Sequence, residues 1–209
     1  MQKSGRVSEA VIRRLPKYYR YLKEMKMNGV ERISSRELSR KMGLTASQIR
    51  QDFNCFGGFG QQGYGYHVDE LCDEIRKILG LDKKHNVIIV GAGNLGRALA
   101  NYIGFEREGF KIKAMFDANP ELIGKKIGET EILAVSTMGD FIADNNIKVG
   151  MISVPKYEAQ DIADQMVERG IKSIWNFAPI DVEIPDSVAI ENVHLSDSLY
   201  TLSFKMNDL

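Results

Sequence analysis

The sequence has few cysteines and no long apolar run, and these two absences exclude several classes of protein. Its 209 residues include two cysteines, Cys55 and Cys72, which have neither the spacing of metal ligands nor the density of a disulfide framework. No apolar run reaches the roughly 18 residues that a membrane-spanning helix needs, and no apolar region follows residues 1–6 as in a secretory signal. We therefore expect a cytoplasmic, reduced protein without a membrane or metal partner. Two interpretations of Cys55 remain: a redox-active thiol, or a cysteine that is buried or incidental.

The formal net charge is zero, yet the charged residues are unevenly distributed along the chain. Residues 1–66 carry 13 Lys and Arg against 5 Asp and Glu, a balance of +8, whereas residues 67–209 carry 15 against 23, a balance of −8. This asymmetry indicates a basic module that meets a polyanion, joined to an acidic module that does not. A solvated basic surface without a partner is the alternative.

The acidic part contains a glycine pattern between a predicted strand and a predicted helix. The apolar run at 87–90 leads into G-x-G-x-x-G at 91–96. In this setting the first glycine permits the turn, the second lets the backbone approach a pyrophosphate, and the third lets the helix lie close to the strand. The helix N-terminus then faces the phosphates, and its apolar face is expected to contain Leu95, Ala98, Leu99 and Tyr102. The residues predicted to bind this part of a dinucleotide are Gly91, Ala92, Gly93, Asn94, Leu95 and Gly96.

An acidic residue at the end of the next predicted strand narrows the choice of nucleotide. Residues 111–116 have a strand pattern, and Asp117 follows Gly96 by 21 residues. A carboxylate at this position accepts hydrogen bonds from a ribose diol and repels a 2′-phosphate, so NAD(H) is favoured over NADP(H). A Rossmann-like fold for another ligand, such as coenzyme A, is the alternative.

The rest of the acidic part alternates strands and helices. Strands are predicted at 132–135, 148–154 and 172–177, with a helical stripe from 159 to 167. This alternation indicates a parallel sheet covered on both faces, whose ligand lies beyond the carboxyl ends of the strands. No suitable acid–base pair stands there, since Lys156 and Tyr157 are adjacent and point apart, so we expect no catalytic residue. The residues predicted to line the nicotinamide end are Val154, Pro155, Asn176, Phe177, Ala178 and Pro179.

The basic part begins with a helical pattern from 8 to 28, in which Pro16 either kinks one helix or starts a second. A capping box at 34–37 and another at 45–48 then predict two short helices separated by a turn at Gly43. This is a helix-turn-helix. The second helix has Ala46, Ile49 and Phe53 on an apolar face. Its other face carries the residues predicted to contact DNA in the major groove: Ser47, Arg50, Gln51 and Asn54.

A glycine-rich segment at 57–66 follows, with aromatic residues between its glycines. It favours a tight β-hairpin, the wing of a winged helix, whose backbone approaches the phosphate chain; a flexible linker is the alternative. An amphipathic helix from 68 to 79 would close this domain. The wing residues predicted to contact DNA are Gly60, Gly63, Tyr64, Gly65 and Tyr66.

The C-terminal residues 195–209 form a last predicted helix with Leu195, Leu199, Leu202 and Met206 along one face. This stripe packs either on its own sheet or on a second subunit. A dimer is expected independently, because one winged helix reads only a half-site. The predicted organisation is α/β, with a winged-helix DNA-binding domain at 1–80, a Rossmann-like NAD(H)-binding domain at 81–194 and a C-terminal dimerisation helix at 195–209.

These motifs together resemble the Rex family of redox-sensing transcriptional repressors, over essentially the whole chain. The resemblance rests on Arg14-Leu15-Pro16, Tyr18-Tyr19-Arg20, Ser34-Ser35 with Glu37-Leu38, Gln48-Ile49-Arg50 with Asp52, Phe56-Gly57, Phe59-Gly60, Gly63 to Tyr66, Gly91 to Gly96, Phe116-Asp117, Val154-Pro155 and Asn176 to Pro179.

The resemblance implies a homodimer that binds palindromic operator DNA and is released when NADH replaces NAD+. It also implies that the C-terminal helix is exchanged between subunits and that Arg20 and Tyr102 couple the two domains. One residue departs from the family: many members have Lys where this chain has Gln51, which predicts a weaker phosphate contact or a changed base preference. The alternatives are an NAD-dependent oxidoreductase with an N-terminal helix-turn-helix, and a repressor that senses CoA or NADPH.

Overall fold

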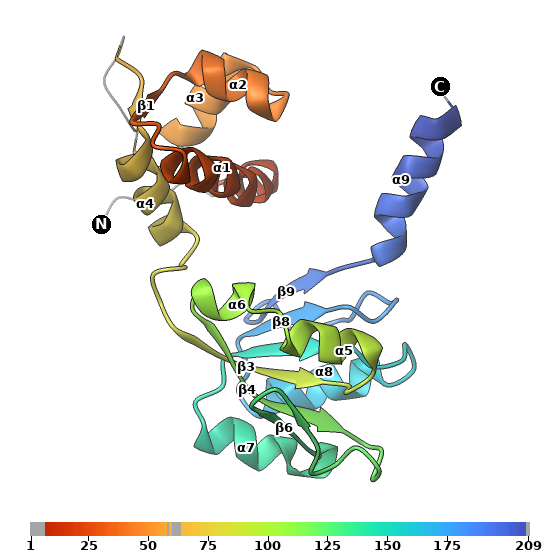
Figure 1. Ribbon diagram of the computed structural model, residues 1–209. Coiled ribbons are helices and arrows are strands. Elements are labelled where there is room, and N and C mark those ends of the chain that lie inside the picture. Colours follow the sequence, from red (N-terminus) through yellow and green to blue (C-terminus); the bar gives the residue numbers. More distant parts are fainter. Residues whose placement is uncertain (1–6, 58, 60–63, 208–209) are drawn as a thin grey trace. The chain divides into compact units, whose positions relative to one another are not determined.

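The computed structural model describes residues 7–57, 59 and 64–207. The chain divides into two compact units, Met1–Asp82 and Lys83–Leu209 (Figure 1). Each unit has its own apolar core.

The first unit is mainly helical, with one two-stranded sheet. Its first helix continues through Pro16, so the two alternatives considered for this residue resolve to a single helix that contains it. Leu22, Ile49 and Ile75 from three different helices are fully buried in the common core. The elements are α1 (Glu9–Met27), β1 (Arg32–Ile33), α2 (Ser35–Met42), α3 (Ala46–Asn54), β2 (Tyr66–His67) and α4 (Val68–Ile78).

Both predicted helices have their N-cap, and among the described residues the complete capping box is found at Ser34 and Glu37 but not at Thr45 and Gln48. Ser34 Oγ accepts a hydrogen bond from the Glu37 N–H at 3.1 Å, and the Ser34 N–H donates to Glu37 Oε2 at 2.9 Å. The Ser34 hydroxyl also donates to Glu37 Oε2 at 2.7 Å, and this hydrogen bond, followed by the one from the Ser34 N–H, lowers the pKa of Glu37. Gly43 ends α2 at φ 68°, and Thr45 Oγ1 then accepts from the Gln48 N–H at 3.1 Å to begin α3. Interactions between residues close in the chain therefore explain where the two helices begin and where the turn lies.

The glycine-rich segment differs from the predicted hairpin in its pairing. Its last strand, β2, pairs antiparallel with the distant β1 and not with another described residue of the segment. This pairing places the Tyr66 ring in the core, where its centre lies 5.2 Å from that of Phe53. At Gly65, with φ +74°, an added Cβ would lie 2.7 Å from the Ile33 carbonyl oxygen. The predicted wing residues Gly60 and Gly63 lie outside the described residues.

The second unit is built on a seven-stranded sheet in the order β5-β6-β4-β3-β7-β8-β9. All neighbouring strands run parallel except β5 and β6. The six strands other than β5, taken in chain order, have the 3-2-1-4-5-6 arrangement of dinucleotide-binding folds. The predicted parallel sheet is confirmed, while β5 and β9 were not predicted. The strands are β3 (His85–Val90), β4 (Phe110–Asp117), β5 (Lys126–Ile127), β6 (Thr130–Ala134), β7 (Val149–Ile152), β8 (Ser173–Asn176) and β9 (Ala189–Asn192).

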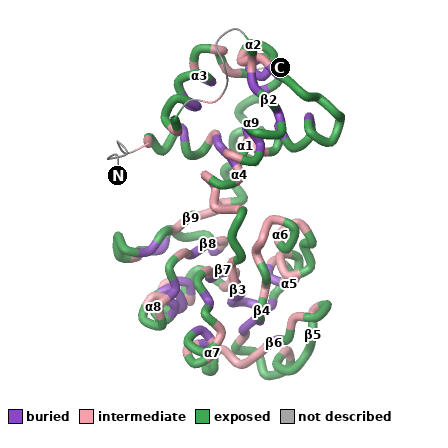
Figure 2. The backbone as a smooth tube through the Cα atoms, turned by 90° about the vertical axis from the view of Figure 1, so that its left-hand side faces the viewer, coloured by how far each residue is buried: buried purple, intermediate pink, exposed green. Residues whose placement is uncertain are grey.

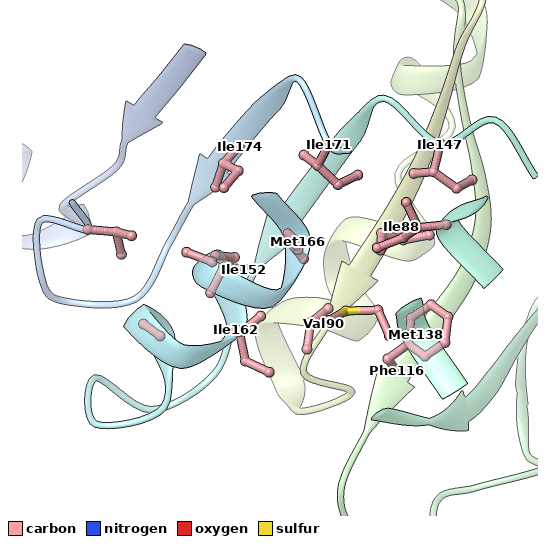
Figure 3. Close-up of a cluster of buried hydrophobic side chains, with 14 of the residues drawn as sticks. Ile88, Val90, Phe116, Met138, Ile147, Ile152, Ile162, Met166, Ile171 and Ile174 are labelled. Atoms are coloured by element: carbon pink, nitrogen blue, oxygen red, sulfur yellow. The ribbon is translucent and has the colours of Figure 1, made fainter. Parts of the chain in front are cut away.

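Helices cover both faces of this sheet, and the alternation along β3 decides which side chains meet them. Ile88 and Val90 face the core cluster shown in Figure 3, together with Met138 and Ile162. Val87 and Ile89 face the opposite cluster. β3 and β7 are buried over most of their length (Figure 2). The helical elements are α5 (Asn94–Ala100), α6 (Gly104–Arg107), the 3₁₀ turn η1 (Val135–Thr137), α7 (Met138–Asp144) and α8 (Ala159–Glu168).

The predicted apolar face of the helix after the glycine turn is only partly correct. Leu95 and Leu99 are partly buried, but Ala98 is exposed and α5 ends at Ala100. Tyr102 therefore lies beyond the helix and is 60 % exposed. The chain turns at this point, and the Tyr102 ring packs over Gly104, where an added Cβ would collide with it.

The last helix, α9 (Leu195–Asn207), buries none of its residues. The predicted stripe residues Leu195, Leu199, Leu202 and Met206 are all exposed. Two alternatives were considered for this stripe, its own sheet or a second subunit. In the described residues the stripe does not pack on the sheet of its own chain.

Candidate functional site

The glycine turn after β3 has the backbone geometry that its pattern predicts. Gly91 has φ +100°, and a Cβ there would lie 2.5 Å from the Ser153 carbonyl oxygen. A Cβ on Gly96 would collide with the Gly91 carbonyl oxygen. Around Gly93, by contrast, an added Cβ meets nothing within 4 Å. Two of the glycines are thus required by close packing of the turn, while the second leaves open space on its outer side.

Asp117 lies beside this turn because β4 pairs with β3, with Phe116 opposite Val90. Its Oδ2 accepts a hydrogen bond from the Ala92 N–H at 2.6 Å, and its Oδ1 accepts from the Asn119 N–H at 2.8 Å. Two backbone donors therefore hold the carboxylate at the edge of the glycine turn. This is the position from which an acidic residue binds a ribose diol in dinucleotide-binding folds.

Ser153, which directly precedes the predicted Val154 and Pro155 and was a candidate at the same strand end, supports the turn from the neighbouring strand. Its hydroxyl is within hydrogen-bonding distance of the Gly91 carbonyl oxygen at 3.0 Å and the Val90 carbonyl oxygen at 3.2 Å. The sequence pointed to Ser153 only through its position at the end of the predicted strand that became β7. Its contact with residues more than sixty positions earlier depends on the order of the strands.

A cavity of about 350 Å³ adjoins the turn, Asp117 and the loop after β7. Its charged lining residues are Asp117 and Glu158, and neither Lys nor Arg occurs among the described residues that line it. Two carboxylates suit a ribose diol and repel an additional phosphate group. The lining residues are Val90, Gly91, Gly93, Asp117, Ala118, Asn119, Val135, Ser153, Val154, Pro155, Glu158 and Ile162.

Only some of the residues predicted for the nicotinamide end line this cavity. Val154 and Pro155 line the cavity. Asn176, Phe177, Ala178 and Pro179 do not line it, although β8 pairs with β7 so that both loops leave the same edge of the sheet. The Asn176 side chain is fully buried, donates to the Ile180 carbonyl oxygen at 2.7 Å and accepts from the Ala178 N–H at 2.9 Å. Its amide therefore holds the loop that follows it.

The first unit presents the predicted DNA-contacting side chains on one exposed face of α3. Ser47, Arg50, Gln51 and Asn54 are all exposed, whereas Ile49 and Phe53 on the other side are buried. The two predicted faces of this helix are confirmed. Arg50 donates from Nη1 to Ser35 Oγ at 2.9 Å, so the guanidinium lies beside the start of α2.

The wing residues are placed differently from one another. Tyr64 is 72 % exposed and remains available for a contact with a partner. Tyr66 is 9 % exposed and its ring lies in the core, so its side chain packs inside the unit, and the contact of this residue with DNA stays a prediction for its backbone. The aromatic ring is drawn inward by packing against Phe53.

A cluster of polar residues between α1 and α3 was not predicted. Asp52 is 3 % exposed and accepts hydrogen bonds from the side chains of Arg14 and Tyr18. The hydrogen bond to Asp52 raises the pKa of Arg14. The sequence offered a weak signal, namely a single carboxylate in a helix that otherwise presents neutral and cationic polar groups.

The two residues implied in coupling are both exposed, one in each unit. The Arg20 guanidinium lies 5.7 Å from the ring centre of Tyr21. The Tyr102 ring lies 4.8 Å from that of Phe105, which begins a series of ring contacts that continues through Trp175 to Phe177. Tyr102 is thus connected by packed rings to one of the loops at the carboxyl edge of the sheet.

The described part of the chain has no group of His, Cys, Asp and Glu side chains arranged to hold a metal ion. Within the same residues, no helix has the length and apolar character needed to cross a membrane. Cys55 is exposed and Cys72 is buried, and both are free thiols.

Comparison with known proteins identifies relatives of both units. A family model described as a putative DNA-binding protein N-terminus matches residues 6–54, and one described as a CoA binding domain matches residues 82–180. The chain is 61 % identical over 208 residues to the redox-sensing transcriptional repressor Rex of Thermoanaerobacter pseudethanolicus, covering 100 % of this chain and 93 % of the relative. It is 59 % identical over 207 residues to Rex of Clostridium botulinum, covering 99 % of each.

Solved structures agree with these relatives. The chain matches RSP in complex with β-NAD+ and operator DNA with a TM-score of 0.93 and 61 % identity, over 98 % of this chain and 94 % of that one. RSP in complex with β-NADH matches with a TM-score of 0.92 and 58 % identity, over 98 % and 96 % of the two chains. Identity of this extent over the full length, together with a glycine turn beside a carboxylate and a helix-turn-helix with an exposed polar face, places the chain in the Rex family of redox-sensing transcriptional repressors.

Proposed function

We propose that this chain is an NADH/NAD+-responsive transcriptional repressor that binds palindromic operator DNA as a homodimer and is released when NADH binds. One observation carries the proposal: a single chain combines a helix-turn-helix with an exposed polar face and a dinucleotide turn beside Asp117. The relatives are transcriptional repressors, and one solved relative holds both β-NAD+ and operator DNA. The chain accordingly acts as a regulator and not as an enzyme.

The charge of the cavity supports NAD(H) over the other nucleotides considered. NADPH carries a 2′-phosphate and CoA a 3′-phosphate on the ribose, and each would approach the two lining carboxylates, Asp117 and Glu158. Repulsion between these charges disfavours both ligands, although the matching family model is described as a CoA binding domain. Titration with NADH, NADPH and CoA in one buffer tests this, with NADH expected to bind most tightly.

Discrimination between the two oxidation states requires a part of the site that contacts the nicotinamide. The glycine turn and Asp117 meet groups that NADH and NAD+ share. The nicotinamide is neutral in NADH and cationic in NAD+, and an apolar pocket disfavours the cation by desolvation. Val154 and Pro155 supply apolar lining to the cavity, and Phe177 to Pro179 stay a prediction for the same end. NADH is expected to bind more tightly than NAD+.

The homodimer is supported by the exposed apolar face of α9. Leu195, Leu199 and Leu202 are each more than half exposed along this helix. An apolar stripe of this kind is stable in water when a second surface covers it. We assign that surface to a second copy, with exchange of α9 between subunits. Two recognition helices would then read the two half-sites of a palindrome.

The deciding experiment measures NADH affinity with and without saturating palindromic operator in the same buffer. If NADH and DNA prefer different arrangements of the dimer, each weakens the other by the same factor. A coupling of about 1–3 kcal/mol corresponds to a change of roughly 5–150-fold. NADH should release the DNA, and NAD+ should oppose it by competition. An NADH affinity that operator leaves unchanged would exclude redox-dependent repression.

A further inference from the structure

A buried carboxylate lies on the inner side of α3, directly between the exposed Gln51 and the buried Phe53. Asp52 accepts from Arg14 Nε at 2.6 Å and from Arg14 Nη2 at 2.7 Å. The Tyr18 hydroxyl donates to the same carboxylate at 2.7 Å. These are short hydrogen bonds to a charged acceptor, and the arginine pair is bidentate. Asp52 thus joins the predicted recognition helix to α1 through contacts of defined direction.

The neighbouring apolar contact between α1 and α3 fixes the rotation of α3 less strongly than these hydrogen bonds do. Tyr18 and Phe53 pack with ring centres 4.9 Å apart. Apolar burial has no preferred direction, so it tolerates a small rotation of α3 about its axis. A guanidinium fork is planar and matches a carboxylate in one orientation. Successive residues of a helix are separated by a fixed rotation, so the orientation of Asp52 also determines that of Arg50 and Gln51.

The energetics also favour a geometric role. Asp52 is removed from water and Arg14 is largely shielded from it, with side chains 4 % and 21 % exposed. A buried ion pair stabilises a fold little in comparison with apolar residues of the same volume, because both charges lose hydration. Burial, and after it the hydrogen bond to Asp52, raises the pKa of Tyr18, so the hydroxyl stays a donor. Three polar groups therefore converge where apolar side chains would hold the helices together equally well.

We propose that Arg14, Tyr18 and Asp52 are positioning residues for operator recognition. Their hydrogen bonds set the rotation of α3 about its axis, and with it the direction in which Arg50 and Gln51 meet the edges of the bases. The inference rests on the proposed DNA-binding function. A direct contact of Arg14 with a DNA phosphate is the competing explanation, and it predicts a different dependence on salt.

The main test replaces the whole cluster with apolar residues, as Arg14→Met, Tyr18→Phe and Asp52→Leu combined in the full-length chain. We expect a folded protein with unchanged NADH affinity, since the second unit is untouched. The ratio of operator to non-specific duplex affinity should fall at least about fivefold, the lower limit for one bidentate base contact. The slope of log affinity against log salt should not change, because no phosphate contact is lost.

A single substitution with a matched control separates the effect of the bidentate guanidinium geometry of Arg14 from the effect of its positive charge. Arg14→Lys keeps the charge but cannot form two parallel hydrogen bonds, so it should also lower the operator preference. Arg13→Lys makes the same change one residue earlier on α1. Arg13 pairs with Glu9 at 3.1 Å, with side chains 63 % and 67 % exposed. This control should keep the preference of the unmodified chain.

Several results would overturn the positioning role. One is a folded triple variant that retains the operator preference. Another is an equal loss of operator and non-specific affinity, which would indicate a general structural effect. Thermal unfolding of Arg14→Lys distinguishes such a loss of stability from a loss of positioning. A salt slope lowered by about one would assign Arg14 to a phosphate. If the unmodified chain shows no operator preference or no NADH coupling, the proposed function itself fails.

Discussion

Among single residues, Asp117 connects the choice of nucleotide to the shape of the glycine turn. Its carboxylate accepts from the Ala92 N–H at 2.6 Å and is one of two negative charges in the cavity. Asp117→Ala removes the diol acceptor and the charge that repels a 2′-phosphate. NADH binding should weaken, and its advantage over NADPH should narrow. Fluorescence titration with both nucleotides measures this.

The control for this substitution is Asp140→Asn, which removes a carboxylate charge outside the cavity. Asp140 pairs weakly with Arg169 at 3.9 Å, and its side chain is 88 % exposed. It should leave both affinities unchanged. Equal affinity of the unmodified protein for NADH and NADPH would contradict the role of Asp117.

Arg50 is the second residue whose role can be measured directly. It is exposed on α3, beside Ser35. If its guanidinium holds a guanine bidentately, Arg50→Ala should cost about 1–3 kcal/mol of specific binding and relax sequence preference. Gel shift with operator and mismatched duplexes measures this effect.

The conservative variant Arg50→Lys refines the assignment. It keeps the positive charge but loses the planar fork, so non-specific affinity should persist while base preference declines. NADH affinity should remain intact in both variants. Unchanged operator affinity of Arg50→Ala at moderate salt would remove this residue from base recognition.

Among the helices, α9 has an ion pair at its base that responds to pH. His194 Nε2 lies 2.9 Å from Asp181 Oδ1, directly before the helix begins. The hydrogen bond to Asp181 raises the pKa of His194 above its ordinary value of 6.5. The stabilising contribution is therefore fully present below pH 6.5 and is lost as pH rises through the higher folded-state pKa. Both partners meet solvent, so the effect on total stability is small.

Titration of the His194 ring signals by NMR tests this pair. In Asp181→Asn the pKa should return toward 6.5, and the pH dependence of α9 order should decrease. A His194 pKa that is the same in both proteins would show that the hydrogen bond does not persist in solution.

For the molecule as a whole, assembly should depend on α9. Deletion of residues 195–209 removes the helix whose apolar side chains are exposed. We expect monomers or aggregates and loss of operator binding, because two half-sites are no longer spanned. Light scattering with a DNA-binding assay measures both properties. Lys205→Ala, on the same helix but outside the apolar stripe, should remain dimeric, and a well-behaved dimer after deletion would place the interface elsewhere.

Much of the site could be predicted because its causes are local. The capping box of Ser34 and Glu37, the close approach of Gly96 to the Gly91 carbonyl oxygen and the acidic end of β4 each depend on residues close in the chain. Alternating apolar runs similarly predicted the parallel sheet. The two faces of α3 followed from helical spacing, since Ile49 and Arg50 differ by a fixed rotation. These features were determined by the sequence alone.

Tertiary structure decided which distant residues meet. Tyr66 lies in the core because β2 pairs with β1, more than thirty residues earlier. Asp52 finds Arg14 across 38 positions, and Ser153 reaches Gly91 across 62. Glu158 enters the cavity because α8 follows the strand beside β3. Such contacts depend on helix packing and strand order, which short-range periodicity does not encode, and so only the folded chain places these side chains.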